Sequence, residues 1–292
     1  MTKVCVIGGS GFLGSHVSDQ LSESGYEVVI YDTTPSPWLR EDQEMIVGDI
    51  LDSDALEPAI NGCEAVYNFA AIADLNDALD KPVDTVLVNI LGNTKVLDMC
   101  RSMDVKRFIY ASTVYVYSRD GGFYRCSKQA AEQYVEEFQR RYNLDYTILR
   151  YGSLYGTRST SNNGLFQIVQ AAINEGKLRY EGSPEALREY IHVEDAARAS
   201  VNALGSEFRN QSVVLTGQEP MRVLDLLKMI AEIMGINEPV EFIETDIPGH
   251  YVRTPYAYLP KLGRKYVPPM HVDMGQGLLQ LIDEIKKRDG QS

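Results

Sequence analysis

The sequence predicts an α/β fold, in which a doubly wound parallel sheet is followed by a smaller C-terminal lobe. Short apolar runs alternate with helical patterns through the first 150 residues, as in parallel sheets that helices cover on both faces. A glycine-rich turn follows the first of these runs. Beyond residue 156, glycines, prolines and isolated aromatic residues replace the alternation, which indicates a second, less regular lobe.

The N-terminal stretch has the order of a dinucleotide-binding unit. An apolar strand is expected at Lys3–Ile7, a helix after the turn GGSGFLGSH, and a second strand at Tyr26–Tyr31 that leads into Asp32. The turn carries glycines at a spacing of three (Gly8, Gly11 and Gly14). Strand, turn, helix, strand and acid together predict a Rossmann-type unit. A turn that uses glycines for no ligand is the alternative.

Each of these residues has an expected role toward a bound dinucleotide. Gly8 permits the tight turn, Gly11 lets the pyrophosphate approach the backbone, and Gly14 lets the helix pack closely. Phe12 and Leu13 begin the helix, where free N–H groups and the positive end of the dipole attract phosphate. Asp32 would accept hydrogen bonds from the adenosine ribose and repel a 2′-phosphate, which favours NAD over NADP.

The next elements continue the alternation as far as residue 103. A loop with two prolines follows Asp32. Asp74 is expected at a helix N-cap or turn, with a functional acid as the alternative. Lys81–Met103 reads as one long amphipathic helix. The other expected elements are a strand at Glu44–Val47, a helix at Ala55–Asn61 and a strand at Glu64–Ala70.

The stretch Arg107–Lys128 is where we expect the chemistry. Its apolar start, Phe108–Ala111, predicts a buried strand, and Ser112 and Thr113 stand at the strand end, where open α/β sheets place ligands. A turn at 120–122 leads into a helix in which Tyr124 and Lys128 share one face. A cation beside a phenol stabilises phenolate, and lowering a tyrosine pKa from about 10 towards 7 requires roughly 4 kcal/mol. Such a tyrosine takes a proton from a hydroxyl while hydride leaves the same carbon. An exposed helix face is the alternative.

The remaining elements complete the sheet and the lobe. The helix that carries Tyr124 is expected to run to Tyr142. A sixth strand is expected at Tyr146–Arg150, a strand near 213–215 that returns to the main sheet, a helix at Met221–Met234 and a strand at Glu241–Ile243. We therefore expect residues 1–155 to form the NAD-binding domain and residues 156–292 mainly the substrate-binding lobe.

The glycine spacing and the Tyr-x-x-x-Lys pair resemble the extended short-chain dehydrogenase/reductase family, and within it the nucleotide-sugar epimerases and dehydratases. Further similar motifs are NFAA at 68–71, VNILGN around Asn89, LRYGSLYG at 149–156 and REYIHVEDAARA at 188–199. The resemblance implies that Thr113 binds the reacting sugar hydroxyl, with Ser112 in reserve. It implies that Tyr124 is the base, ahead of Tyr115 and Tyr117, and that Lys128 holds the nicotinamide ribose.

The resemblance also assigns further contacts to NAD and to substrate. Asp49 and Ile50 would flank the adenine. The residues expected along the rest of the cofactor are Ala70, Ala71, Ala73, Asn89, Tyr124 and Lys128. Substrate would be a nucleotide-diphosphate sugar, with expected contacts at Thr113, Ser153 and Arg188. Two further candidates come from their place in the sequence: Asn163 before a helix start and Arg253 in a basic, aromatic stretch. Asn163 has a helix cap as its alternative, and the two arginines have surface salt bridges as theirs.

The residues after Thr113 discriminate between the reactions of the family. Dehydrating members carry Asp-Glu there and decarboxylating members a Glu, whereas this chain has Val114 and Tyr115. We therefore expect an NAD-dependent nucleotide-sugar 4-epimerase. The alternatives are a 4-dehydrogenase or ketoreductase, which the short loop 118–123 favours, and a non-catalytic NAD-binding protein.

Composition excludes several other classes. A net charge of −13 argues against a polyanion such as nucleic acid as partner. No apolar run reaches membrane-spanning length, the N-terminal apolar run stops at Gly8-Gly9 and is too short for the apolar region expected of a secretory leader, and the four cysteines are scattered. We expect a cytoplasmic protein with reduced thiols and no metal site, in which His192 is not catalytic. The resemblance implies a homodimer through helices 81–103 and 124–142, although burial against the sheet alone would explain their apolar stripes.

Overall fold

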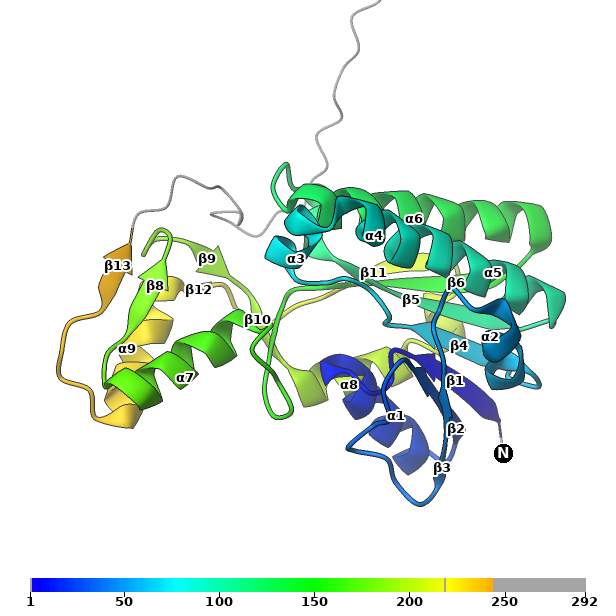
Figure 1. The fold of residues 1–292 in the computed structure, drawn as a ribbon, viewed down its shortest axis with the longest axis horizontal. Helices are drawn as coiled ribbons and strands as arrows, with labels where there is room; N and C mark the ends of the chain where they lie inside the picture. Colours follow the sequence, from blue (N-terminus) through cyan, green and yellow to red (C-terminus); the bar gives the residue numbers. More distant parts are fainter. Residues whose placement is uncertain (1, 218, 244–292) are drawn as a thin grey trace, which may run out of the picture. The chain divides into compact units, whose positions relative to one another are not determined.

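A computed structural model describes residues 2–217 and 219–243 (Figure 1), and its centre is a seven-stranded sheet. The strand order is β11-β6-β5-β4-β1-β2-β3, and every neighbouring pair is parallel. The bounds are β1 Lys3–Ile7, β2 Glu27–Asp32, β3 Gln43–Val47, β4 Ala65–Asn68, β5 Arg107–Thr113, β6 Asp145–Tyr151 and β11 Gln211–Leu215. The predicted α/β class and parallel sheet are confirmed, and the strand near 213–215 does return to the sheet.

Helices cover both faces of this sheet (Figure 1), which is why its central strands β1, β4 and β5 are almost wholly buried. One face is covered by α1 (Phe12–Glu23) and α8 (Val193–Asn202). Val17 and Leu21 of α1 pack there against β1, β2 and β4. On the other face lie α2 (Ser53–Ile60), α5 (Asn93–Ser102) and α6 (Gly122–Tyr142). The motif REYIHVEDAARA contains the first part of α8, a helix that periodicity in its irregular surroundings did not predict.

The expected single helix at 81–103 has a more complex form. It consists of α4 (Pro82–Val86), a π-helical turn η1 (Leu87–Gly92) and α5, which continue one another in right-handed helical geometry. A π-turn inserts an extra residue and rotates the side chains beyond it, and such turns are frequent at functional sites. A short helix that was not predicted, α3 (Leu75–Asp80), precedes it, and Asp74 caps α3 as expected.

The second lobe is built from short elements. Three two-stranded sheets pair β7 (Ser153–Tyr155) with β10 (Tyr190–His192), β9 (Leu187–Arg188) with β12 (Met221–Arg222), and β8 (Arg179–Glu181) with β13 (Glu241–Ile243). Helices α7 (Gly164–Glu175) and α9 (Val223–Met234) enclose a separate small core that contains Ala172, Leu178 and Leu227. The described residues also form two short 3₁₀ turns, η2 (Val114–Tyr117) and η3 (Ser206–Phe208).

The topology determines where a ligand binds. The chain leaves β1 for β2 and β3 on one side and then crosses back to β4 on the other side, so the strand order reverses beside β1. Open α/β sheets bind ligands outside the carboxyl ends of the strands at such a point. Residues that follow β1, β2, β3 and β4 line one groove there. Among the described residues, no helix combines the length and apolarity needed to cross a membrane.

Candidate active site

The glycine-rich stretch after β1 leaves no space for side chains at three of its positions, Gly8, Gly9 and Gly14. Gly8 has a φ of +80°, and a Cβ there would lie 2.6 Å from the backbone nitrogen of Ala70. A Cβ on Gly14 would lie 2.1 Å from the Gly8 carbonyl oxygen. Gly14 is therefore required by the loop itself, whereas the expectation was that it allows helix and strand to pack.

Gly11 meets a different requirement. It is the N-cap of α1, and among the described residues no side chain caps the first amides of that helix. A Cβ on Gly11 would make only a close contact of 3.3 Å with the Gly8 carbonyl oxygen. An alanine here would therefore require the Gly8 carbonyl to shift by a few tenths of an ångström, and the helix end keeps uncapped amides suited to an anion such as a pyrophosphate.

A groove of about 340 Å³ runs along this loop. Asp32 stands at its wall, where one carboxylate oxygen accepts a hydrogen bond of 3.0 Å from the Ser10 amide. The predicted cofactor residues that line the groove are Gly8, Gly11, Asp32, Asp49, Ile50, Ala70 and Ala71. Residues that the sequence analysis did not name also line it: Ile7, Tyr31, Thr33, Gly48, Phe69, Ile72 and Val88. Most of these residues end a strand or directly follow one, and that place in the sequence is what could have predicted them.

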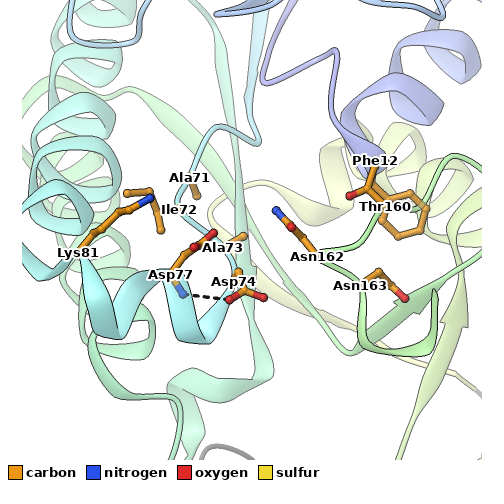
Figure 2. Close-up of a pocket in the computed structure, with 10 residues that line it drawn as sticks. All are labelled: Phe12, Ala71, Ile72, Ala73, Asp74, Asp77, Lys81, Thr160, Asn162 and Asn163. Atoms are coloured by element: carbon orange, nitrogen blue, oxygen red, sulfur yellow. Dashed lines mark hydrogen bonds between the residues drawn. The ribbon is translucent and has the colours of Figure 1, made fainter. Parts of the chain in front are cut away.

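A second cavity of about 380 Å³ shares Ala71 and Ile72 with the groove (Figure 2). Phe12, Asn162 and Asn163 face Ala73 and Asp74 across it. Its remaining lining residues are Asp77, Lys81 and Thr160. The two spaces therefore adjoin at the 71–72 segment.

Asn89 holds the wall between these two spaces. It lies in the π-turn η1, where it is 2% exposed. Its amide nitrogen donates to the Ile72 carbonyl (3.0 Å) and to the Ser127 hydroxyl (2.9 Å), and its carbonyl oxygen accepts from the Ile72 amide (2.8 Å). The side chain thus ties the pocket wall to α6 one residue before Lys128, and a direct contact with cofactor stays a prediction.

The three expected catalytic residues do come together. Thr113 ends β5, and its side chain hydrogen-bonds the Tyr124 hydroxyl. The ammonium of Lys128 donates to the Ala111 carbonyl (2.7 Å) and lies 5.9 Å from the centre of the Tyr124 ring. Ser112, the reserve candidate, donates its hydroxyl to Glu132 instead, which favours Thr113.

Burial dominates the electrostatics of this group. It raises the pKa of Tyr124 to about 12, an effect that the hydrogen bond with Thr113 opposes. It also lowers the pKa of Lys128 to about 7, against the attraction of Glu132. The protein alone therefore does not produce the expected fall in the tyrosine pKa, because desolvation outweighs the hydrogen bond with Thr113.

The short loop after η2 closes onto Tyr115. The Tyr115 ring meets the Tyr124 ring edge-on with centroids 6.5 Å apart. Gly121 has a φ of +92°, and a Cβ there would lie 2.7 Å from Cδ1 of Tyr115. Val114 is buried. The two positions after Thr113 thus contribute an aliphatic side chain and a phenol to this region, and no carboxylate.

The expected substrate residues lie on the lobe side. Ser153 begins β7, which pairs with β10. Asn163 caps α7 through its carbonyl oxygen and donates to the Leu154 carbonyl (2.8 Å), so the cap alternative holds, and the residue also lines the second cavity. Arg188 is 6% exposed in β9, where it donates to the Leu187 carbonyl. Arg253 lies outside the described residues.

The family model described as "NAD dependent epimerase/dehydratase family" matches residues 4–215. This span contains the glycine-rich loop, the groove and the Thr113–Tyr124–Lys128 group. The chain belongs to the NAD-dependent epimerase/dehydratase family. Members of this family are enzymes whose cofactor is NAD, and the uncapped end of α1 beside Asp32 fits that cofactor.

Known members are similar over most of the chain. The mouse UDP-glucose 4-epimerase is 28% identical over 254 residues, which are 70% of this chain and 73% of that protein. The structure of Thermotoga maritima UDP-glucose 4-epimerase with UDP-glucose superposes with a TM-score of 0.80 at 27% identity, over 88% of this chain and 90% of that one. The Bacillus cereus UDP-glucuronic acid 4-epimerase with UDP-glucuronic acid and NAD has a TM-score of 0.80 at 24% identity, over 90% and 95%. This last similarity shows the fold.

Proposed function

We propose that this member of the family is a nucleotide-sugar 4-epimerase. The observation that carries the proposal is the pair of residues after Thr113, since Val114 and Tyr115 bring no carboxylate to the side of Tyr124. Dehydration and decarboxylation need such a group, whereas oxidation at one carbon needs only the Thr113–Tyr124–Lys128 group. Asp74, an acid at the second cavity, is engaged as the cap of α3.

Tyr124 would perform the proton transfer. The substrate hydroxyl would bind at the Thr113 side chain, which already hydrogen-bonds the phenol. Tyr124 would take the hydroxyl proton as the C–H bond of the same carbon breaks, which leaves a ketone. NAD, when bound, would supply the hydride acceptor and donor for this carbon, and Tyr124 would return the proton to its oxygen as hydride is restored on the opposite face.

The substrate would be a nucleotide-diphosphate sugar. The UDP-sugars bound in the T. maritima and B. cereus structures support this class. Ser153, Asn163, Arg188 and Arg253 are our proposed contacts, and the guanidinium groups would suit the diphosphate. The cavity beside Ala73 would receive the sugar or the adjoining part of the cofactor.

A net dehydrogenase or ketoreductase is the second candidate, and the loop 118–123 favours it. The loop turns directly from Ser118 to Gly121 and packs on Tyr115. A short loop covers less of a site, and an open site retains a keto intermediate poorly.

The deciding experiment incubates the purified protein with UDP-, GDP-, CDP- and dTDP-sugars, with and without added NAD. Interconversion of C4 epimers without net reduced cofactor is the expected result. Stoichiometric NADH together with release of a keto-sugar would instead establish a dehydrogenase. Tyr124→Phe is the matched control, since it removes the proton acceptor and should abolish hydride transfer while NAD binding persists.

We also propose that the protein is a homodimer through helices 81–103 and 124–142. Apolar side chains on α4 and η1 are exposed, among them Val83 (69%) and Leu91 (43%). Phe123 and Tyr134 are exposed on α6, which packs beside α4 and η1 (Figure 1). The sheet therefore does not bury the whole apolar stripe of these helices, and a second copy would cover the remainder.

A further inference from the structure

Glu132 is a buried acid whose role the proposed reaction does not explain. It lies on α6 one turn beyond Lys128, which lies one turn beyond Tyr124, so the three side chains follow one face of the helix. Only 7% of Glu132 is exposed. A buried carboxylate is costly unless it is paired and hydrogen-bonded, so its partners indicate what it does.

Three donors engage this carboxylate. Arg150 of β6 binds it in a bidentate manner, with Nε 3.0 Å from Oε1 and Nη2 2.7 Å from Oε2. The Ser112 hydroxyl donates to Oε1. Ser112 and Arg150 are register partners on the adjacent strands β5 and β6, so the parallel pairing itself places them side by side. Bidentate, charge-assisted bonds of this kind determine orientation as well as adding binding energy.

The same network reaches the turn that follows Thr113. Arg150 donates through Nη1 to the Tyr117 hydroxyl, and its guanidinium lies 4.8 Å from the centre of the Tyr117 ring. Thr113 stands between Ser112 and this turn, η2. The end of β5, strand β6 and helix α6 therefore meet at the Glu132–Arg150 pair, and the turn η2 joins it through Arg150. Two of these elements, β5 and α6, carry Thr113, Tyr124 and Lys128.

Glu132 also supplies a negative charge close to Lys128. The groups that face the Lys128 ammonium are the Ala111 carbonyl, the Tyr110 ring at 4.8 Å, and Tyr124 and Glu132 from its own helix. Burial lowers the Lys128 pKa and Glu132 opposes that effect. Arg150 pairs with the same carboxylate at 2.7 Å.

We propose that Glu132 is a positioning residue for the redox step, which holds Thr113 in register with α6 and keeps Lys128 protonated. The inference rests on proposed proton transfer at Tyr124, and it is independent of which sugar reacts or whether the product is an epimer. Two residues on one helix face then have different roles. Lys128 would contact cofactor and phenol, and Glu132 would act through Lys128.

The test measures the charge of Lys128 directly in the full-length protein. The ¹³Cε shift of Lys128 is followed from pH 5 to 9 in protein labelled with ¹³C-lysine, and its signal is assigned by its loss in Lys128→Met. In Glu132→Gln the midpoint should fall by about one pH unit. Glu137→Gln, which removes an exposed acid on the same helix, should leave the midpoint unchanged.

The pH dependence of turnover provides the second readout. A midpoint lower by one unit implies that the ratio of wild-type to Glu132→Gln activity rises about fivefold between pH 6 and pH 8, from the change in protonated fraction. A Lys128 midpoint equal to that of the wild type would overturn the proposal. If the wild type turns over no nucleotide sugar, the proposed function fails, and the lysine titration still decides this inference.

A double variant separates positioning from simple structural support. Glu132→Gln alone leaves Arg150 without its carboxylate and can unfold the protein. Glu132→Gln/Arg150→Met removes both charges and should restore the melting temperature, while the low Lys128 midpoint and the altered pH profile persist. Recovery of the wild-type midpoint and profile in the double variant would show a purely structural role and reject the proposal.

Discussion

The Lys128 ammonium lies 5.9 Å from the centre of the Tyr124 ring, and burial moves the two pKa values in opposite directions. The neutral forms of both groups are favoured, since a buried site penalises phenolate and ammonium alike. Only Thr113 and Glu132 oppose these shifts among the causes that act on the pair. The site therefore depends on a bound partner and on its own carboxylate network to reach the charged pair that proton transfer requires.

The depressed pKa of Lys128 predicts a specific pH dependence of stability. The pKa of Lys128 is about 7 in the folded protein and 10.5 ordinarily. Between these two pH values the unfolded chain binds a proton that the folded protein lacks. The free energy of unfolding should therefore rise with pH above 7, by up to roughly 1 kcal/mol per pH unit from this residue. Urea unfolding at pH 7 and pH 8.5 measures the effect, and Lys128→Met should lack it. If the free energy of unfolding changed equally with pH in the wild type and in Lys128→Met, the lowered pKa of Lys128 would be contradicted.

Two glycines of the N-terminal loop should respond differently to alanine. Gly14→Ala places a methyl group 2.1 Å from the Gly8 carbonyl oxygen, and overpacking of this kind should lower the free energy of unfolding by at least about 2 kcal/mol. Gly11→Ala makes a contact of only 3.3 Å and should melt near the wild type, but its methyl group would obstruct the pyrophosphate. Thermal unfolding and NAD titration separate the two effects. A stable Gly14→Ala, or a Gly11→Ala that binds NAD normally, would refute these assignments.

Asp32 should control cofactor affinity and choice. Asp32→Asn removes the charge that would accept ribose hydrogen bonds, and such bonds contribute about 1.5–3 kcal/mol. The dissociation constant for NAD should therefore rise roughly 10- to 100-fold, and the preference over NADP should narrow. Calorimetric titration with each cofactor measures both changes. Asp42→Asn, an exposed acid paired with Arg40, is the control and should bind NAD as the wild type does.

The exposed stripe on α4 and η1 should hold two copies together. Val83→Lys/Leu91→Lys introduces charges into the proposed interface, and the variant should elute as a monomer by size-exclusion chromatography with light scattering. Ile233→Lys alters an equally apolar, 78% exposed position on α9 and should remain dimeric. A monomeric wild type, or a double variant that remains dimeric, would exclude this interface.

The sequence alone determined the framework of the site. Apolar alternation predicted the parallel sheet, with β1 and β13 at their observed bounds and the ends of β2 and β5 displaced by one or two residues. Glycine spacing and the i, i+4 relation of Tyr124 to Lys128 are local properties, because a turn or a helix converts them directly into neighbouring positions. The position of Asp32 is also a local property, because this residue ends its strand and therefore lies at the sheet edge.

Tertiary structure alone decided the partners of the polar side chains. Periodicity shows which face of an element is apolar, but not which distant residue meets it. Asn89 reaches Ile72 and Ser127, which are 17 and 38 residues away, because a π-turn rotates it inward. Glu132 and Arg150, 18 residues apart, meet because the register of β5 with β6 places Arg150 beside Ser112 under α6. Strand register and helix docking are set by the packing of the whole sheet, so no local pattern contains them.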